Sequence, residues 1–144
     1  MKVGIRAAFC NGIALRALDL AVVYAESREV WGVPISTHQA ISHPLAEVKI
    51  DSELAQNMTL RAASVFDSDG DCGASANYSK FAAARAAVKA LIGRSRPMVA
   101  MDLRRIIASQ NYFGRPVCFR TAPVSEEMIL NYVANNILGM RRSY

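Results

Sequence analysis

The chain has 144 residues, of which 52% are apolar and 20% charged, and its mean hydropathy is +0.14. This composition excludes an intrinsically disordered chain and fits one globular domain. Alanine and leucine are frequent, whereas aromatic residues make up only 8%. Because alanine and leucine lose little free energy on entering a helix, and β-branched and aromatic residues favour strands, we expect an all-α fold.

The three cysteines, Cys10, Cys72 and Cys118, are widely spaced and odd in number. None of them forms a Cys-x-x-Cys pair, so the sequence predicts neither a disulfide framework nor a zinc site. No apolar run reaches the roughly 20 residues that a membrane span needs, and the N-terminus lacks the pattern of a signal peptide. We therefore expect a cytoplasmic protein without a membrane span.

The net charge of +5 is concentrated in one part of the chain. Six arginines and one aspartate lie between Ile92 and Arg120, so this segment accounts for the whole excess. A basic helical protein that binds nucleic acid is a second alternative that rests on this segment alone, and we do not expect nucleic acid among the partners. It predicts an affinity that falls steeply as salt is added.

A long helix and a sharp turn are predicted in the first quarter of the chain. Apolar residues recur at helical spacing from Ala7 to Glu26, with alanines between them, which predicts a helix buried on most sides. The stretch from Arg28 to Ser36 contains Trp31, Gly32 and Pro34. Glycine and proline interrupt helices, so we expect a turn here.

Three more helices are predicted beyond this turn. Ser36 and Gln39 have the spacing of a capping box, which predicts the start of the second helix. The Asp- and Gly-rich run at 67–73 ends it, since these residues favour turns. Helical spacing resumes from Ala74 to Leu91, and Ser125 begins a last helix that continues towards Gly139. The segment 92–119 fits neither period, and we expect one domain over 1–144 with an irregular segment there.

No metal site is expected. The alternating aspartates of the 67–71 run resemble the start of a calcium loop, but Cys72 and Tyr78 occupy the positions of the required glycine and bidentate glutamate. His38 and His43 have no further ligand at metal-binding spacing, so capping or surface roles are expected for them.

The residues around the first turn suggest a binding site for an anionic cofactor. Arg28 ends a long helix beside Trp31 and a glycine turn. Its planar guanidinium suits a pyrophosphate, and the indole offers a flat face to a ring system. In isolation, the simpler alternative is a salt-bridged Arg28 and a Trp31 in the core.

Longer strings extend this cluster into a family resemblance. The strings from Ala17 to Ile35 and from Gln39 to Glu47 resemble the C-terminal helical domain of acyl-CoA dehydrogenases. The string Arg120-Thr-Ala-Pro-Val-Ser-Glu-Glu-Met128 resembles the start of that domain's last helix. The resemblance covers the chain except 92–119, and it implies a four-helix up-down bundle.

The resemblance also implies a set of FAD contacts. Arg28 would contact the pyrophosphate of the FAD of a neighbouring subunit, Trp31 would line the flavin side, and Gln39 would hydrogen-bond the cofactor. Ser125 and Glu127 match the Thr-Ser-Glu element that also touches FAD in this family. These five residues are the candidate cofactor-binding residues.

The function implied by the resemblance is FAD-dependent α,β-oxidation of an acyl-CoA thioester. In the family, a glutamate takes the α-proton and the β-carbon gives a hydride to flavin N5, in an assembly of dimers of dimers. The implied partners are further copies of this chain or a partner acyl-CoA dehydrogenase subunit. The acyl-CoA substrate is implied only for the intact family.

The sequence departs from the family at the positions that carry catalysis. The catalytic glutamate of many members falls at Pro123, and the substrate-side arginine falls near Val3, so no catalytic residue is assigned. The chain begins inside the third domain of the family, so we expect a fragment that lacks two domains and is inactive alone. The alternative is a non-catalytic remnant, or a helical oligomerisation module, that does not bind FAD.

The family's Gln-x-x-Gly-Gly-x-Gly motif is missing from the 92–119 segment. The peptide from Arg96 to Asp102 can be encoded AGA CCC ATG GTG GCA ATG GAC. Displaced by one base and preceded by C, the same nucleotides encode Gln-Thr-His-Gly-Gly-Asn-Gly. Our hypothesis is that this segment is translated out of frame relative to its ancestor, which would also explain its arginines. A divergent loop of independent origin is the alternative.

Overall fold

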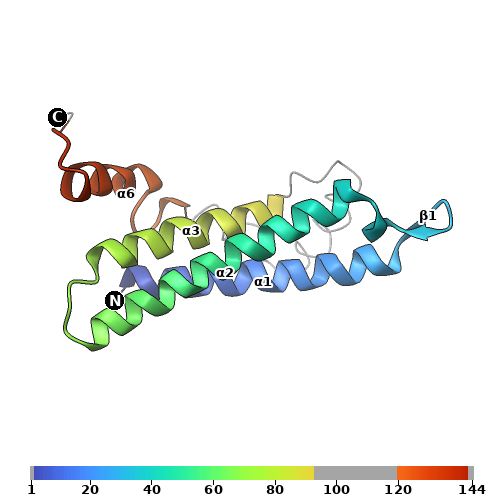
Figure 1. Cartoon of the computed structure of the whole chain (residues 1–144), viewed down its shortest axis with the longest axis horizontal. Coiled ribbons are helices and arrows are strands. Elements are labelled where there is room, and N and C mark those ends of the chain that lie inside the picture. The colour runs from blue at the N-terminus through green and yellow to red at the C-terminus, as the bar shows by residue number, and fades with distance from the viewer. Residues whose placement is uncertain (1, 93–119, 143–144) are drawn as a thin grey trace.

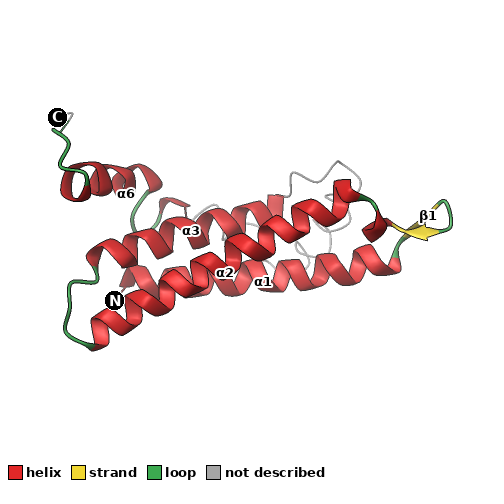
Figure 2. Cartoon of the chain, viewed as in Figure 1, coloured by secondary structure: helices red, strands yellow, loops and turns green. Residues whose placement is uncertain are grey.

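The computed structural model describes residues 2–92 and 120–142, which form helices and one small hairpin (Figure 2). The elements are α1 (Lys2–Ser27), β1 (Glu29–Val30), β2 (Val33–Pro34), the 3₁₀ turn η1 (Ile35–Thr37), α2 (Gln39–Asp67), α3 (Gly73–Ile92), α6 (Glu126–Tyr132) and the π-helical turn η2 (Val133–Ile137). The hypothesis of a displaced reading frame concerns a segment whose residues 93–119 lie outside the described residues.

The three long helices lie side by side, each antiparallel to the next along the chain (Figure 1). The β1–β2 hairpin projects from the end where α1 passes into α2, and α6 lies beside the N-terminal half of α3, near the opposite end (Figure 1). The predicted all-α bundle with four principal helices is confirmed for the described part of the chain.

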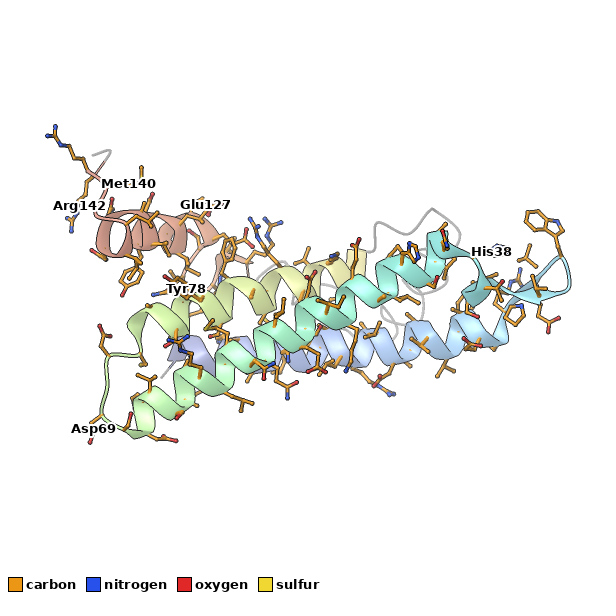
Figure 3. All side chains as sticks on the ribbon, in the orientation of Figure 1. His38, Asp69, Tyr78, Glu127, Met140 and Arg142 are labelled. Atoms are coloured by element: carbon orange, nitrogen blue, oxygen red, sulfur yellow. The ribbon has the colours of Figure 1, made fainter. Side chains whose placement is uncertain are left out.

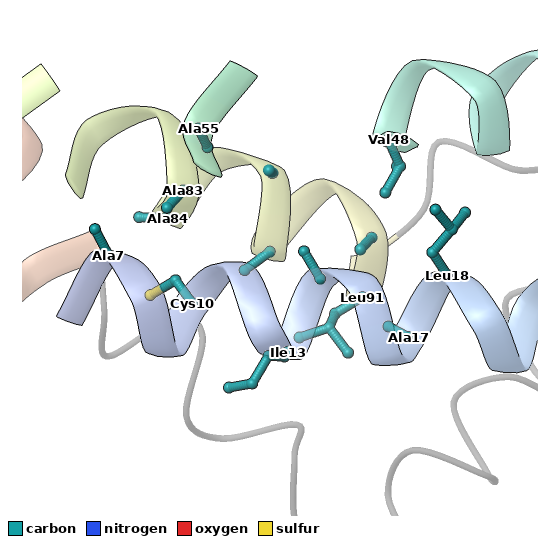
Figure 4. Packing of buried hydrophobic residues seen from close by; sticks show 14 of the residues in the cluster. Ala7, Cys10, Ile13, Ala17, Leu18, Val48, Ala55, Ala83, Ala84 and Leu91 are labelled. Carbon is teal, nitrogen blue, oxygen red and sulfur yellow. The ribbon is translucent and has the colours of Figure 1, made fainter. Parts of the chain in front are cut away.

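The core of the bundle is built largely from alanine. Small side chains of α1 meet those of α3, and Figure 4 shows Ala7 and Ala17 from α1, Ala83 and Ala84 from α3, and Ala55 from α2 in this cluster. Short side chains let helices approach closely while still excluding water, and burial of their methyl groups stabilises the bundle.

Helix α1 is the most apolar of the three long helices. By length and composition, its segment Val3–Ser27 is the one described helix that would suffice to cross a membrane. No apolar stretch of this length was expected from the sequence. In this structure one face of α1 packs against both α2 and α3 as part of the core.

The capping-box prediction for α2 was wrong. Ser36 lies inside the 3₁₀ turn η1, and α2 begins at Gln39 after His38, whose side chain forms no cap. The turn after Pro34 is closed by Thr37, whose hydroxyl donates to the Pro34 carbonyl at 2.8 Å. Gln39 is therefore the first helical residue and cannot reach back as the third residue of a capping box would.

The other predicted boundaries agree with the structure to within a few residues. In the Asp-rich turn, Asp69 has a left-handed backbone with φ of 56°, and the Asp71 carboxylate accepts a 2.9 Å hydrogen bond from the Gly73 amide. The last helix begins after Ser125 as predicted, but it is α-helical only to Tyr132 and then widens into the π-helical turn.

Candidate functional site

The tip of the hairpin holds a strained aromatic residue. Val30 pairs with Val33, so Trp31 and Gly32 form a two-residue turn, with φ of 55° and 77°. Two successive positive φ values are typical of a type I′ turn, where the first position favours Asn, Asp or Gly. A tryptophan in the left-handed region costs about 1–2 kcal/mol relative to an unstrained backbone. Such strain, kept at an exposed position, is typical of functional sites.

The Trp31 indole lies on the surface, with 90% of its area exposed. Among the described residues its ring contact is with His38, edge-on, with the ring centroids 6.4 Å apart. The alternative of a core tryptophan is therefore wrong. An exposed indole is available to a ligand or to another protein chain.

Arg28 and Gln39 lie at the same end of the bundle as Trp31. Arg28 follows α1, where its amide donates to Tyr24 O at 2.9 Å and its carbonyl accepts from Ile35 N at 2.8 Å. These bonds fix the backbone of Arg28 and leave its side chain exposed, and no ion pair joins it to any described carboxylate. Gln39 is exposed at the start of α2.

A hollow adjoins this end of the bundle. It has a volume of about 690 Å³ and lies between α1 and α2. Leu18, Val22 and Leu45 form part of its apolar wall, and Glu26 and Ser36 connect it to the hairpin region.

Ser125 and Glu127 lie near the opposite end of the bundle. The Ser125 hydroxyl caps α6 by accepting a 3.3 Å hydrogen bond from Met128 N. Glu127 is fully exposed, and its carboxylate has a lowered pKa because its own backbone amide and the Ser125 hydroxyl hydrogen-bond to it. The structure therefore brings Ser125 and Glu127 together.

The candidate residues form two clusters that are far apart within one chain: the hairpin cluster, which consists of Arg28, Trp31 and Gln39, and the α6 cluster, which consists of Ser125 and Glu127. Figure 3 shows His38, beside the hairpin, and Glu127, on α6, towards opposite ends of the bundle. Helix α2, which runs between these ends, has 29 residues and is therefore about 43 Å long. The hairpin cluster and the α6 cluster of one chain cannot contact the same small molecule.

The residues at the two positions where the family resemblance places the catalytic glutamate and the substrate-side arginine cannot act as acid or base. Pro123 is exposed in the loop before α6, and Val3 is half-buried in the first turn of α1. Neither side chain can take or give a proton. In the part of the chain that the structure describes, no group of three or more histidine, cysteine, aspartate or glutamate side chains is placed to bind a metal.

A buried polar cluster beneath α6 was not predicted from the sequence. The Lys80 side chain has no exposed surface, and its ammonium donates to the carbonyls of Arg120 and Val124. The buried Glu126 carboxylate pairs with the Arg120 guanidinium and also lies 3.6 Å from Arg85 Nε. A signal was present in the sequence, since Lys80 has the same helical register as three buried residues, Ala84, Ala87 and Leu91.

Comparison with known proteins agrees with this architecture. Residues 4–92 match the family model "Acyl-CoA dehydrogenase, C-terminal domain". The acyl-CoA dehydrogenase FadE12 of Mycobacterium tuberculosis is 40% identical over 140 residues, which are 96% of this chain and 36% of that protein. The chain thus spans about a third of the length of this relative.

Solved structures show the same fold. The structure titled "PigA with FAD and proline" has a TM-score of 0.85 at 22% identity, and the match covers 98% of this chain and 37% of the PigA chain. A probable acyl-CoA dehydrogenase from Mycobacterium abscessus has a TM-score of 0.81 at 22% identity, over 94% of this chain and 36% of its own. The family match over most of the described residues, together with this shared fold, shows that the chain belongs to the acyl-CoA dehydrogenase family, whose C-terminal helical domain it contains.

Proposed function

We propose that this chain is the helical component of an FAD-dependent acyl-CoA dehydrogenase and contacts two FAD molecules. Arg28, Trp31 and Gln39 would bind the FAD of a neighbouring subunit, and Ser125 and Glu127 would touch the FAD at their own end of the bundle. The observation that carries the proposal is Trp31, which has a strained backbone and is 90% exposed at the same end of the bundle as the exposed Arg28.

The exposed groups at the hairpin fit the chemistry of this cofactor. The Arg28 guanidinium can donate two parallel hydrogen bonds to a pyrophosphate, and the Gln39 amide can both donate and accept. The Trp31 indole can cover a ring and exclude water from one of its faces. FAD, when bound, supplies the acceptor for the hydride of an acyl-CoA thioester.

The separation of the two clusters supports an oligomer. Since the hairpin residues and the α6 residues of one chain cannot contact one cofactor, a complete site needs a second chain. We propose another copy of this chain or a partner acyl-CoA dehydrogenase subunit. Catalysis also needs a base from elsewhere, because proline occupies position 123. We therefore propose that the chain alone does not oxidise acyl-CoA.

Titration of the purified chain with FAD tests the proposal. We expect flavin absorbance to co-elute with the protein and the melting temperature to rise with FAD concentration, because a ligand of the native state stabilises it. Arg28→Ala and Gln39→Ala should reduce both effects. Arg61→Ala is the matched control, since Arg61 is also exposed but lies far along α2.

A different result would favour the alternative. A colourless chain whose melting temperature does not respond to FAD would contradict FAD binding and leave a helical oligomerisation module. Exposed apolar side chains on α2, among them Ile50 at 59% and Leu54 at 63%, provide such a module with an association surface. Sedimentation velocity without FAD would then report the oligomer.

A further inference from the structure

Lys80 is a lysine at a core position. Its side chain has no exposed surface, although lysine is among the residues least often buried without a partner. Cys10 of α1 and the α3 alanines Ala83 and Ala84 are likewise without exposed surface. A buried ammonium has to be compensated by hydrogen bonds inside the protein.

Among the described residues, both hydrogen-bond acceptors of Lys80 belong to the segment that leads into α6. Its Nζ donates to the Val124 carbonyl at 2.6 Å and to the Arg120 carbonyl at 3.1 Å. These acceptors are 44 and 40 residues away along the chain, so the two bonds fasten that segment to the middle of α3.

The charged and titratable groups around the ammonium come from each neighbouring element. They are Cys10 from α1, Glu126 and Glu127 from α6, and Arg120 from the preceding segment. Burial lowers the pKa of Lys80, and the thiol and the two carboxylates oppose that change. Burial is the larger effect, so these charges compensate the buried ammonium only in part, and the two carbonyl hydrogen bonds supply further stabilisation.

A second interaction closes the same segment on itself. Arg120 donates from Nε to Glu126 Oε1 at 3.0 Å and from Nη2 to Glu126 Oε2 at 2.8 Å. The loop between these two residues is thus held at its ends by side chains, and it is held to α3 by Lys80. Ser125 follows Val124 directly, so its position depends on where the Val124 carbonyl is fixed.

We infer that Lys80 is the positioning residue of the α6 end: by holding the carbonyls of Arg120 and Val124, it places Ser125 and Glu127 for contact with the cofactor. We call the two hydrogen bonds from Lys80 to the Arg120 and Val124 carbonyls the latch. The effect of the latch on FAD binding rests on the proposed function, but the latch itself can be tested without FAD. Lys80 touches no cofactor in this arrangement and acts only through the loop.

Hydrogen exchange of the purified chain tests the latch. In Lys80→Met, which keeps an unbranched apolar side chain and removes the ammonium, we expect the α6 amides to exchange about tenfold faster, while the amides of α1 and α2 change less than about threefold. Lys89→Met is the matched control on the same helix, because Lys89 is partly exposed and bonds to Glu47 and Asp51 of α2 instead. Unchanged α6 exchange in Lys80→Met would overturn the inference.

Measurement of FAD binding distinguishes a positioning role of Lys80 from a general loss of stability. Ala84→Gly, in the core of the same helix, lowers stability but keeps the Lys80 ammonium that bonds to the loop. We expect Lys80→Met to weaken FAD binding about tenfold and to alter the visible absorbance of the bound flavin. At the same temperature, Ala84→Gly should bind FAD as the wild type does, although its melting temperature falls by the same amount. Equal FAD binding by both variants would also overturn the inference.

The two proposals fail in different ways. If the wild-type chain does not bind FAD, the proposed function fails, and hydrogen exchange still decides the latch. If Lys80→Met does not fold, the wild-type protein decides it by nitrogen-15 NMR. We expect a slowly exchanging lysine ammonium signal coupled through a hydrogen bond to the Val124 carbonyl carbon, and its absence would contradict the latch.

Discussion

Arg120 and Glu126 form a two-pronged ion pair in which the glutamate is buried and the arginine is half exposed. The exposed fractions of their side chains are 5% and 46%, and the two hydrogen bonds measure 3.0 and 2.8 Å. The hydrogen bonds to Glu126 and the negative charge of its carboxylate stabilise the protonated guanidinium, so the pKa of Arg120 is raised. This pair closes the loop that precedes α6.

Removal of the buried carboxylate should destabilise the protein measurably. We expect Glu126→Ala to lower the free energy of unfolding by about 1–2 kcal/mol, because two charge-assisted hydrogen bonds are lost while Arg120 can still be solvated. Urea denaturation measures this change. The control is Glu53→Ala, which removes an exposed partner of Lys49 and should cost less than about 0.5 kcal/mol. Equal costs for the two variants would contradict a structural role of the buried pair.

The hairpin tip should show a trade between stability and binding. Trp31→Asn replaces a strained residue with one that tolerates positive φ, so we expect the protein to gain up to about 1 kcal/mol. The same variant should lose FAD binding, since the exposed ring is gone. Thermal unfolding and FAD titration measure the two effects.

Trp31→Phe serves as the control for this hairpin prediction. It keeps an aromatic ring and the backbone strain, so its stability should equal that of the wild type within error. A Trp31→Asn protein that is less stable than the wild type would show that the indole contributes packing that outweighs the strain.

The thiol of Cys10 should make stability depend on pH in the alkaline range. Burial raises the pKa of Cys10 to about 11 from an ordinary value of 9.0, an effect that Lys80 and Arg6 partly oppose. The folded protein therefore holds this proton more tightly than the unfolded chain. Its stabilising contribution is complete below pH 9.0 and is lost as the pH rises to about 11.

Urea denaturation at several pH values measures this loss, which should reach about 2–3 kcal/mol. Cys10→Ala has no thiol to ionise, so its stability should decline less between the same pH limits. Titration of the tyrosines and of the lysines other than Lys80 is common to both proteins and cancels, whereas the interaction of Lys80 with the Cys10 thiolate is part of the difference. Parallel declines in the two proteins would show that Cys10 makes no contribution.

The nucleotide sequence of the gene tests the origin of the 92–119 segment. We expect the frame displaced by one base to encode Gln-Thr-His-Gly-Gly-Asn-Gly across the codons for Arg96 to Asp102. The original frame should be restored before the codon for Arg120. Codons whose displaced frame lacks the paired glycines would contradict the hypothesis and favour a divergent loop.

Periodicity was sufficient to predict the helices, because each has an apolar stripe and few β-branched residues. The turn at 67–73 was also predicted, since Asp71 and its glycine neighbours act locally. The start of α2 was not predicted correctly, because Thr37 and Pro34 form a competing turn that the spacing of Ser36 and Gln39 does not reveal.

The candidate site was predictable only in part. Arg28, Trp31 and Gln39 were selected from a local string, and the structure places them at one end of the bundle. The importance of Lys80 was not predicted, because its acceptors are backbone carbonyls 40 or more residues away. Backbone acceptors have no residue type, so a sequence pattern cannot identify them.

The contact between α1 and α3 consists mostly of methyl groups from alanines such as Ala14, Ala17, Ala84 and Ala87. Truncation of one of these alanines to glycine removes a single methyl group and leaves almost no void, so its cost comes mainly from the lower helix propensity of glycine. A larger side chain has the opposite effect, because even one extra methyl group at any of these positions would push α1 and α3 apart. We therefore expect these alanine positions to accept only glycine or serine, and tolerated variation in the two helices to concentrate on their outer faces.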